Sequence, residues 1–82
     1  MAARVKEIRE WLEDGASIGA THVIVCCDTY DYTDYPSYVM PNESVVACVR
    51  NKSCYPMTKI MEVYNLSMDI ERQLQERRAW NL

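Results

Sequence analysis

The sequence predicts a small α+β domain in which helices pack on a three-stranded sheet. Three observations predict this class. Apolar residues recur at helical spacing in some segments and at strand spacing in others, 49% of the 82 residues are hydrophobic, and only two glycines and three prolines interrupt the pattern. A chain of this length forms one domain, spanning residues 1–82, and is too short for a two-domain enzyme or a dinucleotide-binding fold.

The first half of the chain predicts a helix followed by the central strand. Ile8 and Leu12 recur at helical spacing within residues 3–14, and charged side chains fill the opposite face. Gly15 is placed to cap the end of this helix. Residues 21–29 are apolar on both faces, which is typical of a strand that is covered on both sides.

The second half predicts four further elements, so that the order is helix, strand, strand, helix, strand, helix. Pro36 separates a polar and aromatic loop from the second strand, Asn42 caps the second helix, and Ser67 or Asp69 caps the last one. These elements lie at residues 37–40, 42–50, 59–66 and 68–79. If the third strand pairs with the first, the second and third strands are parallel, and the helix between them crosses the sheet right-handed.

The chain predicts a protein of the cytoplasm. No apolar run approaches the roughly 18 residues that span a bilayer, and charged residues stand where a signal peptide would need its apolar stretch. In that reducing compartment the four cysteines are expected to be free thiols. They are Cys26, Cys27, Cys48 and Cys54.

Acidic and aromatic residues are concentrated after the predicted central strand. Residues 16–49 contain four acidic side chains and no Lys or Arg, and four of the six tyrosines lie there. Tyrosine offers a large contact area at low entropic cost, so this composition predicts a surface that docks on a basic partner. The alternative is a solvated turn in which Asp31 or Asp34 bonds its own backbone. The predicted partner-binding residues are Asp28, Tyr30, Asp31, Tyr32, Asp34, Tyr35 and Glu43.

The same residues do not predict catalysis, a cofactor or a metal site. Calcium loops place acids at alternate positions with a glycine in the turn, whereas Asp28, Asp31 and Asp34 are three residues apart without one. His22 has no nucleophile near it in sequence and is expected to be half-buried with its ring hydrogen-bonded. A net charge of −3 argues against direct binding of nucleic acid. We therefore expect a protein that is not an enzyme.

Two blocks of sequence resemble a group of small accessory proteins of phages and prophages. The first is GATHVIVCCDTYDY at residues 19–32, followed by DYP at 34–36, and the second is MEVYNLSMD at residues 61–69. Members of that group share similar blocks and a charged C-terminal helix. The resemblance covers most of the chain from residue 19 onward and implies a gene carried by a phage or mobile element. It carries over no catalytic residue.

The resemblance and the acidic surface together predict an inhibitor of a host defence complex. Small accessory genes of this kind often encode such inhibitors, including anti-CRISPR proteins. The expected partner is the basic surface of a bacterial nucleic-acid-handling complex such as a CRISPR effector. The alternative is a regulator or sponge for a small nucleotide-like signal, as a monomer or a homodimer. A ligand phosphate would then use Arg50, Lys52 and Lys59, the only clustered bases that are away from acids.

Overall fold

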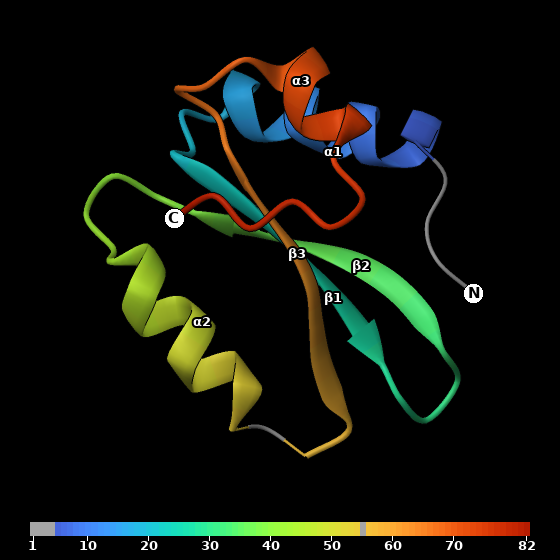
Figure 1. Ribbon diagram of the computed structural model, residues 1–82. Coiled ribbons are helices and arrows are strands. Elements are labelled where there is room, and N and C mark those ends of the chain that lie inside the picture. Colours follow the sequence, from blue (N-terminus) through green and yellow to red (C-terminus); the bar gives the residue numbers. More distant parts are fainter. Residues whose placement is uncertain (1–4, 55) are drawn as a thin grey trace.

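The predicted class and order of elements are confirmed by a computed structural model, which describes residues 5–54 and 56–82 (Figure 1). Three helices and three strands follow one another in the predicted sequence of types. They are α1 (Val5–Ser17), β1 (His22–Asp28), β2 (Thr33–Val39), α2 (Val45–Ser53), β3 (Thr58–Asn65) and α3 (Ile70–Gln75). Each helix in these described ranges is too short or too polar to cross a membrane.

The sheet has β1 at its centre, as the two apolar faces of this segment predict. The strand order is β2-β1-β3, and both neighbours run antiparallel to β1, so β2 and β3 are parallel to each other. His22 lies opposite Val39 on one side and Asn65 on the other. The pairing of β1 with β3 shifts register between Val25 and Cys26, an irregularity of the kind that a β-bulge produces.

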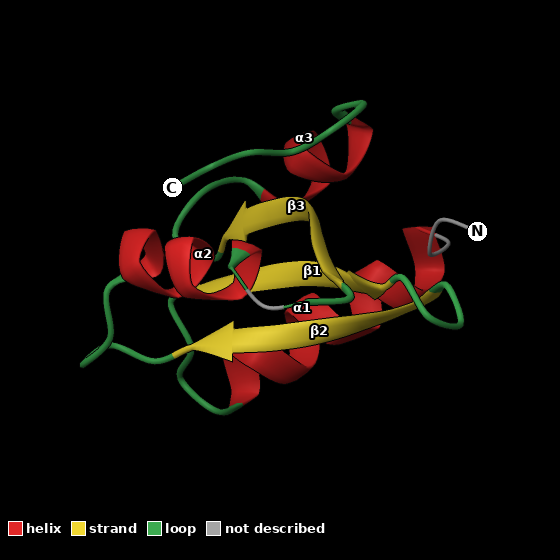
Figure 2. Cartoon of the chain, turned by 90° about the horizontal axis from the view of Figure 1, so that it is seen from below, coloured by secondary structure: helices red, strands yellow, loops and turns green. Residues whose placement is uncertain are grey.

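The core has two halves, one on each face of the sheet, because side chains alternate along β1. In Figure 2, α2 lies in front of the sheet and α1 behind it. The face of α1 and α3 holds Ile8, Leu12, Val23, Val25, Tyr64 and Ala79. The face of α2 holds Ile24, Cys26, Val39 and Val63, which pack against Val45, Cys48, Val49 and Ile60.

Gly15 does not end the first helix, contrary to the sequence prediction. The helix continues to Ser17, and Gly15 is buried where α1 crosses the sheet. A Cβ atom at this position would lie 2.9 Å from Cγ2 of Val23 and 3.2 Å from Cδ1 of Tyr38. Gly19, with φ +81°, instead supplies the left-handed backbone after the helix. Gly15 therefore serves close packing rather than capping.

The second strand is longer than residues 37–40. It begins at Thr33, so part of the segment predicted as a loop is in the sheet, and Pro36 lies within the strand. Proline cannot donate to a ladder of hydrogen bonds, but an edge strand leaves one side unpaired and tolerates it. Because β2 is an edge strand, Pro36 did not mark a boundary.

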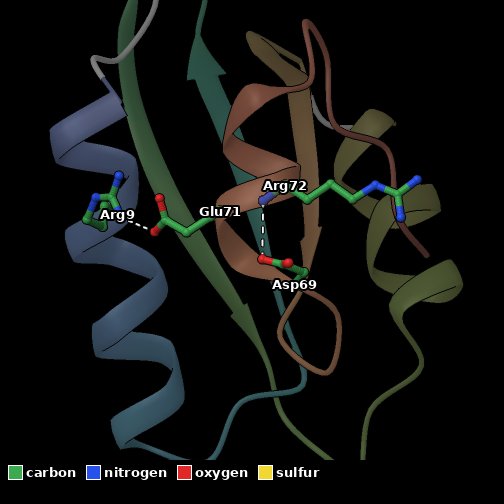
Figure 3. Close-up of polar contacts among 4 residues, drawn as sticks. All are labelled: Arg9, Asp69, Glu71 and Arg72. Atoms are coloured by element: carbon green, nitrogen blue, oxygen red, sulfur yellow. Dashed lines mark hydrogen bonds and ion pairs between the residues drawn. The ribbon is translucent and has the colours of Figure 1, made fainter.

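The two later helices also differ from their predicted bounds. Ser44, rather than Asn42, caps α2 by accepting a hydrogen bond from the backbone N–H of Ala47 at 3.3 Å. Asp69 caps α3, as one of the two predicted alternatives, and accepts from the N–H of Arg72 at 3.3 Å (Figure 3). This helix ends at Gln75 instead of residue 79.

The chain after α3 returns to the sheet and pairs with the outer edge of β3 at Val63. The N–H of Val63 donates to the carbonyl of Ala79 at 2.9 Å, and the N–H of Asn81 donates to the carbonyl of Val63 at 3.0 Å. Val63 and Trp80 thus form a parallel bridge. On the face of the sheet that α1 and α3 cover, Arg9 of α1 forms an ion pair with Glu71 of α3 (Figure 3).

Candidate protein-binding surface at the hairpin end of the sheet

Six of the seven predicted partner-binding residues lie around the tight connection between β1 and β2. Asp28 is the last residue of β1 and pairs with Thr33, the first residue of β2. The four residues between them form the turn, and the N–H of Tyr32 donates to the carbonyl of Asp28 at 2.6 Å. We call this end of the molecule the hairpin end.

Two aspartates shape this turn through their side chains. Oδ1 of Asp28 accepts a hydrogen bond from the N–H of Tyr30 at 2.8 Å. Oδ1 of Asp31 accepts from the N–H of Thr33 at 3.0 Å and also from its hydroxyl. These bonds from Thr33 lower the pKa of Asp31 below its ordinary value. The turn chemistry expected of Asp31 is therefore present, and it holds an ionised carboxylate in a fixed place.

A second turn, which contains Met57, lies beside the hairpin. No pattern in the sequence predicted it. The N–H of Thr29 donates to the carbonyl of Met57 at 2.9 Å, which joins the hairpin to the segment that precedes β3. Tyr32 has φ 58° and Met57 has φ 62°, and among the described residues only these two non-glycine residues have positive φ. Left-handed backbone at a residue with a Cβ costs about 1–2 kcal/mol. Both strained residues of the described chain thus flank one junction.

These turns expose large apolar side chains next to the carboxylates. Tyr30 is 78% exposed, Tyr32 66% and Met57 51%. Together with Asp28 and Asp31 they form what we call the hairpin-end surface. Strained backbone that persists next to exposed apolar side chains is typical of functional sites, because packing alone gives no reason to retain it.

Asp34 and Tyr35 do not share one surface, although they are adjacent in sequence. Asp34 pairs with Cys27 on the face of α1, and Tyr35 pairs with Cys26 on the face of α2. Burial raises the pKa of the Cys27 thiol, and the facing carboxylate of Asp34 raises it further. Burial also raises the pKa of the Cys26 thiol. The predicted acidic and tyrosine-rich surface is therefore divided between two faces from residue 34 onward.

Glu43 lies apart from the other six residues. It belongs to the connection between β2 and α2, which follows the opposite end of β2. Its Oε1 accepts a hydrogen bond from the N–H of Met40 at 3.0 Å. Glu43 was grouped with the aspartates because residues 16–49 contain no Lys or Arg. In the structure the seven residues of β2 separate Glu43 from them. Glu43 therefore does not lie beside the aspartates of the hairpin.

The single histidine occupies the position expected of it. His22 is half-buried at the start of β1. Its Nδ1 lies 2.9 Å from Oγ1 of Thr21 and its Nε2 lies 3.0 Å from the carbonyl oxygen of Leu82. Both ring nitrogens therefore have partners, as predicted.

The four cysteines are free thiols, as expected. Cys26 and Cys27 are buried in the sheet, Cys48 is half-buried and Cys54 is exposed. Within residues 5–54 and 56–82, no three His, Cys, Asp or Glu side chains gather as a metal ion would need.

The three bases that the alternative function would use are not gathered at one place. Lys59 pairs with Cys27 across the sheet and so lies on the face of α1. Lys52 belongs to α2 on the other face and lowers the pKa of Cys26 through its charge. Because Lys59 and Lys52 face opposite sides of the sheet, they do not form one phosphate site.

The hairpin-end surface thus has three properties of a protein contact, which are exposed apolar area, the carboxylates of Asp28 and Asp31, and a backbone fixed by hydrogen bonds. Comparison of the chain with protein-family models, with curated proteins and with solved structures found no match.

Proposed function

We propose that this chain is a stoichiometric protein-binding inhibitor that docks its hairpin-end surface on a basic surface of a partner. The observation that carries the proposal is the junction of Thr29 and Met57, where two strained turns meet and expose three large apolar side chains. The partner we propose is a nucleic-acid-handling complex of a bacterial host, such as a CRISPR effector. The chain would act in the host cytoplasm as a phage-borne accessory protein.

Charge and apolar area have separate roles in the proposed mechanism. The carboxylates of Asp28 and Asp31 attract a basic surface and speed the encounter, which is sensitive to salt. Tyr30, Tyr32 and Met57 then bury apolar area and slow dissociation. Bound in this way, the chain occludes the surface on which the partner would hold nucleic acid.

Preorganisation supports this assignment. The hydrogen bonds at Asp28 and Asp31 fix the turn before a partner arrives, so less conformational entropy is lost when the surface is buried. A freely solvated turn would need neither the second turn at Met57 nor its left-handed backbone.

The test compares two variants in a binding assay with a purified CRISPR effector complex and in affinity capture from a bacterial lysate. Tyr30→Ala combined with Met57→Ala removes exposed side chains and should leave the fold intact. Met68→Ala is the matched control, because Met68 is also exposed but lies in the turn before α3. Loss of two anchors should weaken binding by about tenfold or more.

Three results would support or overturn the proposal. A partner that the wild type and the Met68→Ala variant capture, that the double variant loses and that high salt releases would support it. Equal capture by all three proteins would overturn the assigned surface. If the wild type neither binds the effector complex nor retains any partner that the double variant loses, the inhibitor function itself is wrong.

A further inference from the structure

A small polar pocket lies between β2 and α2, away from the hairpin end. Its volume is about 180 Å³. It is lined by Ser37, Tyr38, Glu43, Cys48, Asn51 and Lys52. The pocket includes Glu43, one of the predicted residues that the hairpin-end surface does not contain.

The packing of α2 explains why the pocket exists. This helix packs chiefly against β3 and so leaves the same face of β2 partly open. Cys48, Asn51 and Lys52 recur at spacings of three and four along α2 and therefore project from one side of the helix. Ser37 lies opposite Ile24 in the register, on the face of the sheet that α2 covers.

The pocket contains two opposite charges that do not neutralise each other. Glu43 and Lys52 both line it, yet they form no ion pair. The Glu43 side chain is exposed, and its Oε1 accepts a hydrogen bond from the N–H of Met40 at 3.0 Å, which restrains the carboxylate. Lys52 is half-buried, and its charge partly offsets the rise that burial causes in the pKa of the Cys26 thiol. A positive and a negative side chain thus line one hollow without pairing with each other.

The neutral side chains of the pocket are also available to a ligand. Within the part of the chain that the structure describes, neither the Ser37 hydroxyl nor the Asn51 amide forms a hydrogen bond to another residue. Both groups donate and accept, so they can satisfy either end of a polar molecule.

We propose that this pocket binds a small zwitterion, with its anionic end at Lys52 and Asn51 and its cationic end at Glu43. A simple anion or a simple cation would satisfy one charge and leave the other without a partner. A nucleotide is too large, because pockets for drug-sized ligands are about 300–1,000 Å³. Free amino acids and similar dipolar metabolites have the required size and charges. This binding site is independent of the hairpin-end surface.

The experiment titrates the full chain with zwitterions of increasing charge separation and follows amide chemical shifts by NMR. The probes are glycine, γ-aminobutyrate and ε-aminocaproate, and the single-charge controls are butylamine and butyrate. Two charge-assisted contacts on so small a molecule predict a Kd of about 1 mM. At least one zwitterion should cause saturable shifts at Ser37, Glu43 and Asn51, and the single-charge controls should not.

Matched variants separate two-point recognition from weak surface binding. Lys52→Met keeps the alkyl stem, and Glu43→Gln keeps an acceptor for the Met40 N–H. Each substitution should weaken binding of the zwitterion by about tenfold or more. Lys59→Met, on the other face of the sheet, should leave the affinity unchanged. The proposal is overturned if no probe causes saturable shifts at these residues, if butylamine or butyrate binds equally well, or if both variants retain full affinity.

Discussion

Gln73 of α3 pairs its side-chain amide with both main-chain groups of Asn65 at the end of β3. Its Nε2 donates to the Asn65 carbonyl at 2.8 Å, and its Oε1 accepts from the Asn65 N–H at 2.8 Å. Oε1 also accepts from Nδ2 of Asn81 at 3.1 Å. This glutamine is 1% exposed, and it is the only buried polar side chain in the described core. One amide thus ties together the last helix, the last strand and the segment that follows α3.

Replacing Gln73 with leucine should destabilise the fold strongly. Leucine fills a similar volume but leaves the main-chain groups of Asn65 without their partners, which predicts a loss of about 2–4 kcal/mol in the free energy of unfolding. Urea denaturation measures this loss. Gln75→Leu is the control, since Gln75 is exposed in the same helix and should change stability by less than about 0.5 kcal/mol. Equal effects of both substitutions would show that the amide is not structurally important.

Gly15→Ala should lower stability even though alanine is the better helix former. In an exposed helix the change would be favourable by about 1 kcal/mol. At Gly15 the new methyl group meets the β-branched Val23 at 2.9 Å, and overpacking of this kind costs about 1–3 kcal/mol. Thermal unfolding of Gly15→Ala and of the exposed neighbour Ala16→Gly would test this. A rise in Tm for Gly15→Ala would contradict the close approach of α1 to the sheet.

The turn at Asp31 should make stability depend on acid. The pKa of Asp31 is lower in the folded protein than in the unfolded chain, because Thr33 donates to the ionised carboxylate. The unfolded chain therefore takes up this proton first, and the stabilisation is present at neutral pH and fades as pH falls through the acidic range. Asp31→Asn should be less stable than the wild type at pH 7. The difference in stability between the two proteins should shrink as pH falls below the ordinary carboxyl pKa. A difference that stays constant with pH would refute the role of the Asp31 carboxylate.

The four thiols should react at well-separated rates. Cys54 is exposed, whereas Cys26 and Cys27 are buried and their pKa values are raised. Because the thiolate is the reactive form, a disulfide reagent should modify Cys54 first and reach the two buried thiols only when the sheet opens. The fast phase of the reaction should be absent from the Cys54→Ser variant, which would assign that phase to Cys54. Modification of Cys26 or Cys27 as fast as Cys54 in the native protein would contradict the two-sided cover of β1.

Local pattern was enough to predict the elements whose cause is local. The double apolar run placed β1 at the centre of the sheet, and the aspartate at residue 69 was one of two proposed caps for α3. The boundaries predicted at Pro36 and at Gly15 were both wrong, for one physical reason. Each residue type signals a boundary in isolation, but the position of β2 at the sheet edge and the close crossing of α1 override that preference.

The candidate site was only partly predictable because its parts come from distant segments. The aspartates and tyrosines of the hairpin were visible as a cluster of composition, whereas Met57 joins them through a backbone contact with Thr29 that no local pattern indicates. Positive φ at Tyr32 and Met57 was equally hidden, since neither residue type favours it. Gln73 resembles any other polar residue of a surface helix until the fold buries it.

The bridge between Val63 and Trp80 has a consequence for self-association. This segment occupies the outer main-chain groups of β3 at Val63, whereas no described strand pairs with the outer edge of β2. A neighbouring strand that pairs along β3 would have to displace this bridge, so the edge of β2 is the more open of the two. Pro36 further interrupts the donors along that edge. The two edges of the sheet are therefore protected from a neighbouring strand by different means, which are the bridge at Val63 in β3 and the missing N–H of Pro36 in β2.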